Sequence, residues 1–177
     1  MGCGHGLLGV WAAINGAEHV VFQDYNRETL ECATIPTARA NGLNDRDKVT
    51  FVCGDWSKLS DNTCSVDRFS EKSVGFRRFD VIFSSETVYD PTSYPVIRSF
   101  LEKYLEPESG IALFAGKLYY FGVGGGTTSF QQYMATSVRV GTQQWQWQWQ
   151  CVSLGHFEDG QSNSREVLAL RLVRALE

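Results

Sequence analysis

The pattern of hydrophobic and polar positions predicts a chain in which helices and strands alternate. Apolar residues at helical spacing predict helices over residues 7–17, 27–41, 93–104 and 127–138. Short apolar or β-branched runs predict strands over residues 19–24, 48–53, 79–84 and 110–116. Because most successive strands are separated by a helix, we expect an α/β fold, a doubly wound, Rossmann-like sheet of parallel strands.

Three stretches modify this picture. Ile35-Pro36 lies inside the second predicted helix, which the proline should bend or break. The run FDVIFS over residues 79–84 is almost entirely apolar, which is typical of a strand buried on both faces. Residues 57–78 are polar, mixed in charge and without periodicity, so we expect a surface insertion that is partly disordered.

The C-terminal part has a different pattern. Residues 144–150 (QWQWQWQ) alternate strictly, and residues 165–173 alternate after a turn around Asp159-Gly160. Two consecutive strands without an intervening helix predict an antiparallel hairpin. We expect the tryptophan face of the first strand to be core, the alternative being an exposed aromatic binding surface. That face carries Trp145, Trp147 and Trp149.

Composition restricts the class of protein. The chain has 177 residues, of which 43% are hydrophobic and 20% charged, as expected for one soluble globular domain over residues 1–177. Its net charge of −4 argues against a nucleic-acid-binding protein. No membrane span or signal peptide is recognisable. The five cysteines form no Cys-x-x-Cys pair, which predicts reduced thiols, no metal site and a cytoplasmic or nuclear protein.

The glycines at the start of the chain predict a nucleotide-type cofactor. Gly2, Gly4 and Gly6 precede the first predicted helix, where bare backbone can approach a ligand. Asp24 ends the next strand, about 20 residues on, where a carboxylate accepts hydrogen bonds from ribose hydroxyls. This spacing fits both NAD and S-adenosylmethionine. The C-terminal hairpin, in a chain too short for a separate substrate domain, favours S-adenosylmethionine.

One expected strand is missing from the sequence. A buried strand should precede the glycine turn, but the chain begins at Met1. We therefore expect an N-terminally truncated chain that lacks the first strand of its sheet. The strands that end at Asp24 and Ser84 should then not pair with each other.

Five motifs together resemble one family. The chain is similar to the eukaryotic protein-histidine N-methyltransferases of the seven-β-strand, S-adenosylmethionine-dependent class. The motifs are GCGHGLLG (2–9), FQDYN (22–26), GDW (54–56), SETVYDP (85–91) and YFGVGGG (120–126). The resemblance implies strand order 3-2-1-4-5-7-6 with strand 7 antiparallel. It also implies methylation of a histidine ring nitrogen in a protein substrate, the known family target being a large-subunit ribosomal protein.

The cofactor contacts follow from these motifs. The predicted cofactor-binding residues are Gly2, Gly4, Gly6, Asp24, Asn26, Asp55, Trp56 and Ser84. Asp55 can accept a hydrogen bond from the adenine amino group, and Trp56 can stack on the base. As alternatives, Asp24 could cap the helix that starts at Arg27, although Asn26 is the better cap candidate, and Trp56 could be a structural core residue.

The predicted catalytic residues, Glu86, Tyr89 and Asp90, follow the strand 79–84. Methyl transfer from a sulfonium requires mainly alignment, and a histidine with a pKa near 6.5 is largely neutral at pH 7. Glu86 or Asp90 could hold the second ring N–H and stabilise the imidazolium, while Tyr89 orients it. As an alternative, Asp90 could cap a helix, because Pro91 follows it.

Aromatic residues before a glycine run predict a substrate-binding lip. Tyr119, Tyr120, Phe121 and Gly122 follow the strand 110–116 and lead into glycines as far as Gly126. The substrate class stays open at this point, since protein-lysine methyltransferases share the Glu-x-x-Tyr element. A catalytically silent binding or assembly module is a second alternative, and an NAD-dependent dehydrogenase a distant third.

Overall fold

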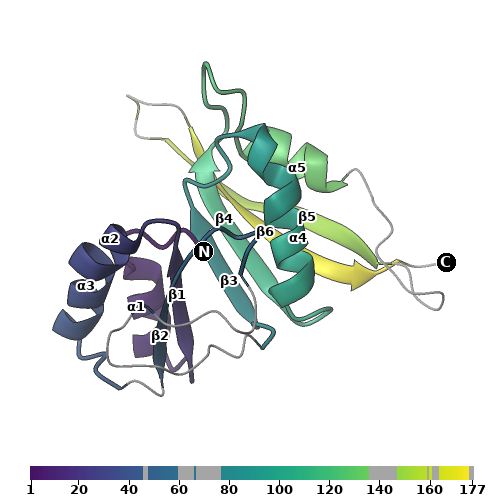
Figure 1. Cartoon of the computed structure of the whole chain (residues 1–177). Coiled ribbons are helices and arrows are strands. Elements are labelled where there is room, and N and C mark those ends of the chain that lie inside the picture. Colours follow the sequence, from purple (N-terminus) through teal and green to yellow (C-terminus); the bar gives the residue numbers. More distant parts are fainter. Residues whose placement is uncertain are drawn as a thin grey trace. The chain divides into compact units, whose positions relative to one another are not determined.

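The computed structural model describes residues 1–45, 48–59, 66, 77–135, 147–158, 160 and 164–175. The chain forms two compact units, Met1–Arg77 and Arg78–Glu177 (Figure 1). Each unit combines helices with a β-sheet, as the α/β prediction requires.

The first unit is built on two parallel strands. Strands β1 and β2 pair in parallel from Val20 with Val49 to Asp24 with Cys53. The prediction of helix, strand, helix and strand is confirmed here. The elements are α1 (Leu7–Ile14), β1 (Val20–Asp24), α2 (Arg27–Thr29), a π-helical turn η1 (Leu30–Thr34), α3 (Ile35–Ala40) and β2 (Val49–Cys53).

The helical segment after β1 is not broken by Pro36. The backbone stays helical from Arg27 to Ala40 but passes through η1, so of the predicted bend or break the break does not occur and a π turn distorts the helix just before Pro36. A wide π turn is one way in which a helix accommodates a residue that cannot donate its backbone hydrogen bond. This turn also places Thr34 inward, where it is fully buried and its hydroxyl donates to the Gly4 carbonyl at 2.5 Å.

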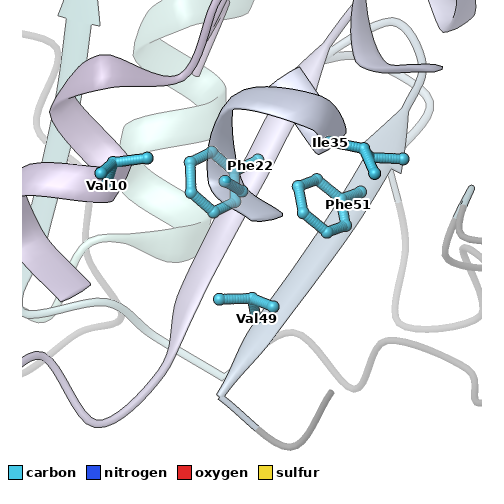
Figure 2. Packing of buried hydrophobic residues seen from close by; sticks show 6 residues of the cluster. Val10, Phe22, Ile35, Val49 and Phe51 are labelled. Atoms are coloured by element: carbon cyan, nitrogen blue, oxygen red, sulfur yellow. The ribbon is translucent and has the colours of Figure 1, made fainter. Parts of the chain in front are cut away.

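A small aromatic core holds this unit together. The rings of Phe22 on β1 and Phe51 on β2 stack with their centroids 5.1 Å apart, and Val10 of α1 and Ile35 of α3 pack beside them (Figure 2). At Gly9, an added Cβ would lie 2.3 Å from the Phe22 ring, so α1 sits directly on β1. This packing fixes where the glycine turn ahead of α1 meets the end of β1.

The second unit contains a four-stranded sheet in the order β3-β4-β6-β5. Strands β3 and β4 are parallel, and β6 runs antiparallel to both β4 and β5, so the predicted hairpin is confirmed. The elements are β3 (Val81–Ser85), a 3₁₀ turn η2 (Pro91–Ser93), α4 (Tyr94–Tyr104), β4 (Ile111–Lys117), α5 (Thr127–Ala135), β5 (Trp147–Phe157) and β6 (Arg165–Arg174).

Two strand predictions in this unit have different outcomes. Trp149 is buried and Trp147 partly buried, which supports a core face, while Trp145 lies outside the described residues. Strand β3 is not buried on both faces: Ile82 is 5% exposed, but Val81 is 45% exposed. An uninterrupted apolar run does not by itself reveal whether the second face of a strand is covered.

The strands that end at Asp24 and Ser85 belong to separate sheets. In the part of the chain that the structure describes, β1 pairs with β2 and β3 pairs with β4. The backbone N–H of Cys3 donates to the Gln23 carbonyl at 2.8 Å. The residues ahead of α1 therefore lie along the carboxyl end of β1.

Most of the segment 57–78 lies outside the described residues. Val66, which is described, is 4% exposed, and its N–H donates to the Phe51 carbonyl at 2.7 Å. At this point the segment contributes to the packing of the first unit. In the described residues, no helix has the length and apolar character needed to cross a membrane, and no group of three His, Cys, Asp or Glu residues is arranged to hold a metal ion.

Candidate functional site

The glycine turn adopts backbone conformations that favour glycine. The φ angles of Gly2, Gly4 and Gly6 are 58°, 51° and 79°. An added Cβ at Gly6 would lie 2.8 Å from Cγ2 of Thr34, whereas at Gly4 it would meet no atom within 4 Å. The turn is therefore tightly packed at Gly6 and open beside Gly4, where a ligand has room to approach the backbone.

Asp24 holds this turn from the end of β1. Its Oδ2 accepts a hydrogen bond from the Gly4 N–H at 2.9 Å, and its Oδ1 accepts one from the Asn26 N–H at 3.0 Å. The carboxylate is 9% exposed, and its oxygens retain lone pairs for further donors. Asn26 occupies the N-cap position of α2, but its side chain makes no capping bond, so its expected capping role is wrong.

Gln23 joins the glycine turn to the loop after β2. Its Oε1 accepts hydrogen bonds from the Gly2 N–H at 3.1 Å and from the indole Nε1–H of Trp56 at 2.7 Å. Its Nε2 donates to the Gly54 carbonyl at 2.8 Å. The motifs of the sequence did not identify Gln23 as a site residue. The available signal was a polar side chain inside the apolar run that ends at Asp24.

The loop after β2 carries the two residues predicted to contact adenine. Trp56 is partly buried, and Gln23 holds the N–H edge of its ring. Oδ1 of Asp55 accepts bonds from the Ser57 N–H at 2.9 Å and the Ser57 hydroxyl at 2.8 Å. These bonds hold the pKa of Asp55 below its ordinary value, which keeps the side chain an anionic acceptor.

In the second unit, Glu86 follows β3 in a strained conformation. Its φ angle is 56°, a region that residues other than glycine rarely adopt, and its N–H donates to the Ala115 carbonyl at 2.8 Å. Oε2 accepts a hydrogen bond from the Tyr120 hydroxyl. Oε1 lies 3.6 Å from Nε of Arg165, a residue that the sequence analysis missed. A phenol and a guanidinium thus hold this carboxylate.

Tyr120 is tied to Glu86 rather than projecting freely from the lip. Its hydroxyl oxygen also accepts a bond from the Lys117 N–H at 3.2 Å. Burial and the bond to Glu86 raise the pKa of Tyr120 to about 12. The phenol is therefore protonated at neutral pH and acts as a hydrogen-bond donor to the carboxylate.

The loop after β4 is attached to the loop after β3. The hydroxyl of Tyr94 lies 3.2 Å from the Val88 carbonyl oxygen and 3.1 Å from the Gly126 nitrogen, and the Gly126 N–H donates to the Val88 carbonyl at 2.8 Å. An added Cβ at Gly125 would lie 2.1 Å from the Tyr89 carbonyl oxygen. The glycines thus allow two backbone segments to meet, and Tyr94, missed at the sequence level, joins them.

The remaining predicted residues differ in accessibility. Tyr89, Tyr119 and Phe121 are 49%, 51% and 87% exposed. The rings of Tyr89 and Tyr120 pack edge to face, with their centroids 6.1 Å apart. Gly122 has a φ of 81° at the exposed tip of the loop. Accessible aromatic surface therefore lies beside the Glu86–Tyr120 pair.

Ser84 and Asp90 have structural partners. The hydroxyl of Ser84 is buried and lies 2.6 Å from that of Thr87. Oδ1 of Asp90 accepts from the Thr92 N–H at 2.9 Å, which lowers the pKa of Asp90 and caps η2. The alternative prediction for Asp90, a helix cap, is thus what the structure shows.

The chain is similar to named proteins over most of its length. It is 32% identical over 170 residues to a histidine protein methyltransferase 1 homolog from Dictyostelium discoideum, a match that covers 96% of this chain and 48% of the relative. It is 36% identical over 157 residues to the homolog from Bos taurus, covering 76% of this chain and 40% of the relative. The chain thus spans about half the length of these relatives. No protein-family model matches it.

Solved structures share the fold at low sequence identity. The methyltransferase domain of bacterial CtHen1-C matches with a TM-score of 0.62 at 13% identity, over 96% of this chain and 86% of that one. A DhpI–SAH complex matches with a TM-score of 0.55 at 14% identity, over 96% of this chain and 73% of that one. The chain therefore has a methyltransferase fold and is homologous, over most of its residues, to the histidine protein methyltransferases.

Proposed function

We propose that this chain carries the methyl-transfer domain of an S-adenosylmethionine-dependent protein-histidine N-methyltransferase. The observation that carries the proposal is the similarity to a histidine protein methyltransferase 1 homolog over 96% of the chain. Two local arrangements support it: Asp24 bonded to the open glycine turn, and Glu86 held by Tyr120 beside exposed aromatic residues.

The proposal extends to the architecture. We take residues 1–177 as one methyltransferase domain with residues 57–78 as an insertion, and strand order 3-2-1-4-5-7-6. The pairing of β1 with β2 corresponds to strands 2 and 3 of that order. The sheet β3-β4-β6-β5 corresponds to strands 4-5-7-6, with the antiparallel β6 as strand 7. Strand 1 has no counterpart among the described residues.

The residues of the first unit fit the predicted cofactor. The open side of Gly4, the spare lone pairs of Asp24 and the fixed indole of Trp56 are what a nucleoside-containing ligand requires. In this proposal Gly2, Gly4 and Gly6 approach the methionine end. Asp24 and Asn26 receive the ribose, Asp55 and Trp56 the adenine, and Ser84 completes the set. When bound, S-adenosylmethionine supplies an electrophilic methyl group.

The residues of the second unit would orient the substrate histidine. Neutral imidazole is the nucleophile, and Glu86 accepts the N–H of the ring nitrogen that is not methylated. This contact selects the tautomer and stabilises the positive charge that develops on the ring. Tyr120 keeps the carboxylate in place, and Tyr89 provides an aromatic wall. The carboxylate of Asp90 already caps η2, so in this proposal Asp90 would contribute to catalysis by fixing the loop that carries Glu86 and Tyr89.

The exposed aromatic residues suit a protein substrate. Tyr119, Phe121 and Gly122 form the accessible edge of the loop after β4, where an apolar segment beside the target histidine can pack. The family resemblance implies a large-subunit ribosomal protein as this substrate.

Methylation of defined peptides tests the proposal. The chain is incubated with labelled S-adenosylmethionine and with histidine or lysine peptides, or with large-subunit ribosomal proteins, and mass spectrometry locates the methyl group. We expect it on a histidine ring nitrogen. Methylation of lysine would identify a protein-lysine methyltransferase, and cofactor binding without transfer to any protein would identify a silent binding module.

A further inference from the structure

We propose that Gln23 is a positioning residue that couples the glycine turn to Trp56, so that both ends of the cofactor site form as one unit. The inference rests on the proposed cofactor site and assigns a role to a side chain that need not touch the cofactor itself.

The contacts of Gln23 span two loops that are distant in sequence. The side chain is 3% exposed, and it bonds the first glycine of the turn on one side and the Trp56 indole on the other. Both bonds end on the same oxygen, Oε1. A movement of the glycine turn that shifts Oε1 therefore also changes the hydrogen bond of the Trp56 indole. A movement of Trp56 likewise changes the hydrogen bond of the Gly2 N–H.

Gly54 is held in the same arrangement by two consecutive residues of β1. Its carbonyl accepts from Nε2 of Gln23 at 2.8 Å, and its N–H donates to the Asp24 carbonyl at 3.0 Å. The backbone immediately before Asp55 and Trp56 is thus fixed on both sides. Asp24 in turn bonds Gly4, so β1 holds each loop through neighbouring residues.

The amide of Gln23 provides this combination on two separate atoms, the acceptor Oε1 and the donor Nε2. The site needs an acceptor for two N–H groups and a donor for one carbonyl, all shielded from water. A carboxylate lacks the donor and a thioether lacks strong donors and acceptors. Each replacement leaves buried groups without partners, which is costly. Gln23 is therefore chemically specific here and is not a space-filling residue.

A double-mutant cycle on the chain tests the coupling. Affinity for S-adenosylhomocysteine is measured by calorimetry for the unmodified chain, Gln23→Met, Trp56→Phe and the double variant. We expect each single change to weaken binding about 10-fold and the double variant to lose far less than the product, because both changes remove the same contact. Gln131→Met is the matched control, since Gln131 makes a single long amide bond, at 3.4 Å, to Cys151, and its affinity should equal that of the unmodified chain.

A second measurement does not need the cofactor. The Trp56 contribution to fluorescence quenching by acrylamide, obtained by difference from Trp56→Phe, should increase in Gln23→Met. Gln23→Glu keeps the acceptor for Trp56 but turns the donor to Gly54 into a carboxylate oxygen that faces the Gly54 carbonyl, so quenching of Trp56 should lie between that of the unmodified chain and that of Gln23→Met. If Gln23→Met fails to fold, Gln23→Glu decides by the same two readouts.

The outcomes separate this inference from the proposed function. Strictly multiplicative losses of affinity, or unchanged quenching of Trp56, would overturn the role of Gln23 while leaving the cofactor site intact. Failure of the unmodified chain to bind S-adenosylhomocysteine would remove the cofactor assignment and this inference with it.

Discussion

The hydroxyl of Tyr120 donates a hydrogen bond to the carboxylate of Glu86, and this contact links the loop after β4 to the residue that follows β3. The two residues are 34 positions apart. Tyr120, predicted to bind the substrate, and Glu86, predicted to be catalytic, are therefore linked, because the orientation of Glu86 depends on the position of Tyr120.

Replacing Glu86 tests its role in catalysis. If Glu86 orients neutral imidazole, Glu86→Gln should lower kcat by about 10²–10⁴ with cofactor affinity nearly unchanged. Steady-state kinetics and calorimetry measure the two quantities. Because imidazole is already neutral, raising the pH should not restore activity. Full recovery at pH 9 would instead indicate simple deprotonation.

Removing the Tyr120 hydroxyl tests the contact itself. Tyr120→Phe should reduce kcat by about 10-fold, the value of one lost hydrogen bond to a charged group, because Glu86 is less well oriented. Tyr119→Phe is a control for the adjacent phenol and should retain near-normal kcat. Equal losses in both variants would contradict a specific role for Tyr120.

The raised pKa of Tyr120 predicts a pH dependence. Burial and the bond from Tyr120 to Glu86 raise the pKa of this phenol to about 12, above its usual value near 10. The unfolded chain then loses this proton before the folded chain does. The contribution of Tyr120 to the free energy of unfolding is present below about pH 10 and is lost as the pH rises through about 12.

Spectroscopic titration checks this assignment. Tyrosinate absorbance should show one late-titrating phenol that is absent in Tyr120→Phe. In Glu86→Gln the pKa of that phenol should fall, because the negative charge of Glu86 raises it and the neutral amide accepts a weaker hydrogen bond. A late phenol that persists in Tyr120→Phe would assign the signal to another tyrosine.

Asp24 is expected to contribute to cofactor affinity. Asp24→Ala removes the acceptor for the ribose and also the bond that holds Gly4. Loss of charge-assisted hydrogen bonds costs about 1.5–3 kcal/mol, which corresponds to roughly 10- to 150-fold weaker binding. Calorimetry with S-adenosylmethionine measures the change. Unchanged affinity would remove Asp24 from the site.

Gly125 should not tolerate a side chain. Gly125→Ala places a Cβ 2.1 Å from the Tyr89 carbonyl oxygen, so the two loops must separate. We expect a lower thermal unfolding temperature and reduced kcat. Gly155→Ala is the control, because its Cβ would meet only ordinary contacts at 3.8 Å. Equal stability of the two variants would contradict the close approach.

Local sequence patterns predicted most elements correctly, because helical spacing and apolar runs are determined by neighbouring residues. The same patterns did not indicate that the distortion near Pro36 is a π turn, and they failed at β3, where burial depended on what covers the second face. In both cases tertiary context decided the outcome.

The partners of the positioning residues could not be recognised for a related reason. Gln23 and Arg165 bond partners that are 33 and 79 residues away, as the pairs with Trp56 and Glu86 show. No local pattern encodes such contacts. By contrast, Asp24 was recognisable because its distance from the glycines is itself a motif.

The π turn at Leu30–Thr34 changes the number of residues per turn at one point of the helical segment between β1 and β2. The i→i+5 spacing of this turn takes up one more residue than an α-helical turn, and the residues that follow it, Ile35 and Ala38, face the core. A deletion in α3 itself would turn its apolar side outward. Because Thr34 at the end of this turn bonds the Gly4 carbonyl, a change in the turn is transmitted to the backbone of the predicted cofactor site.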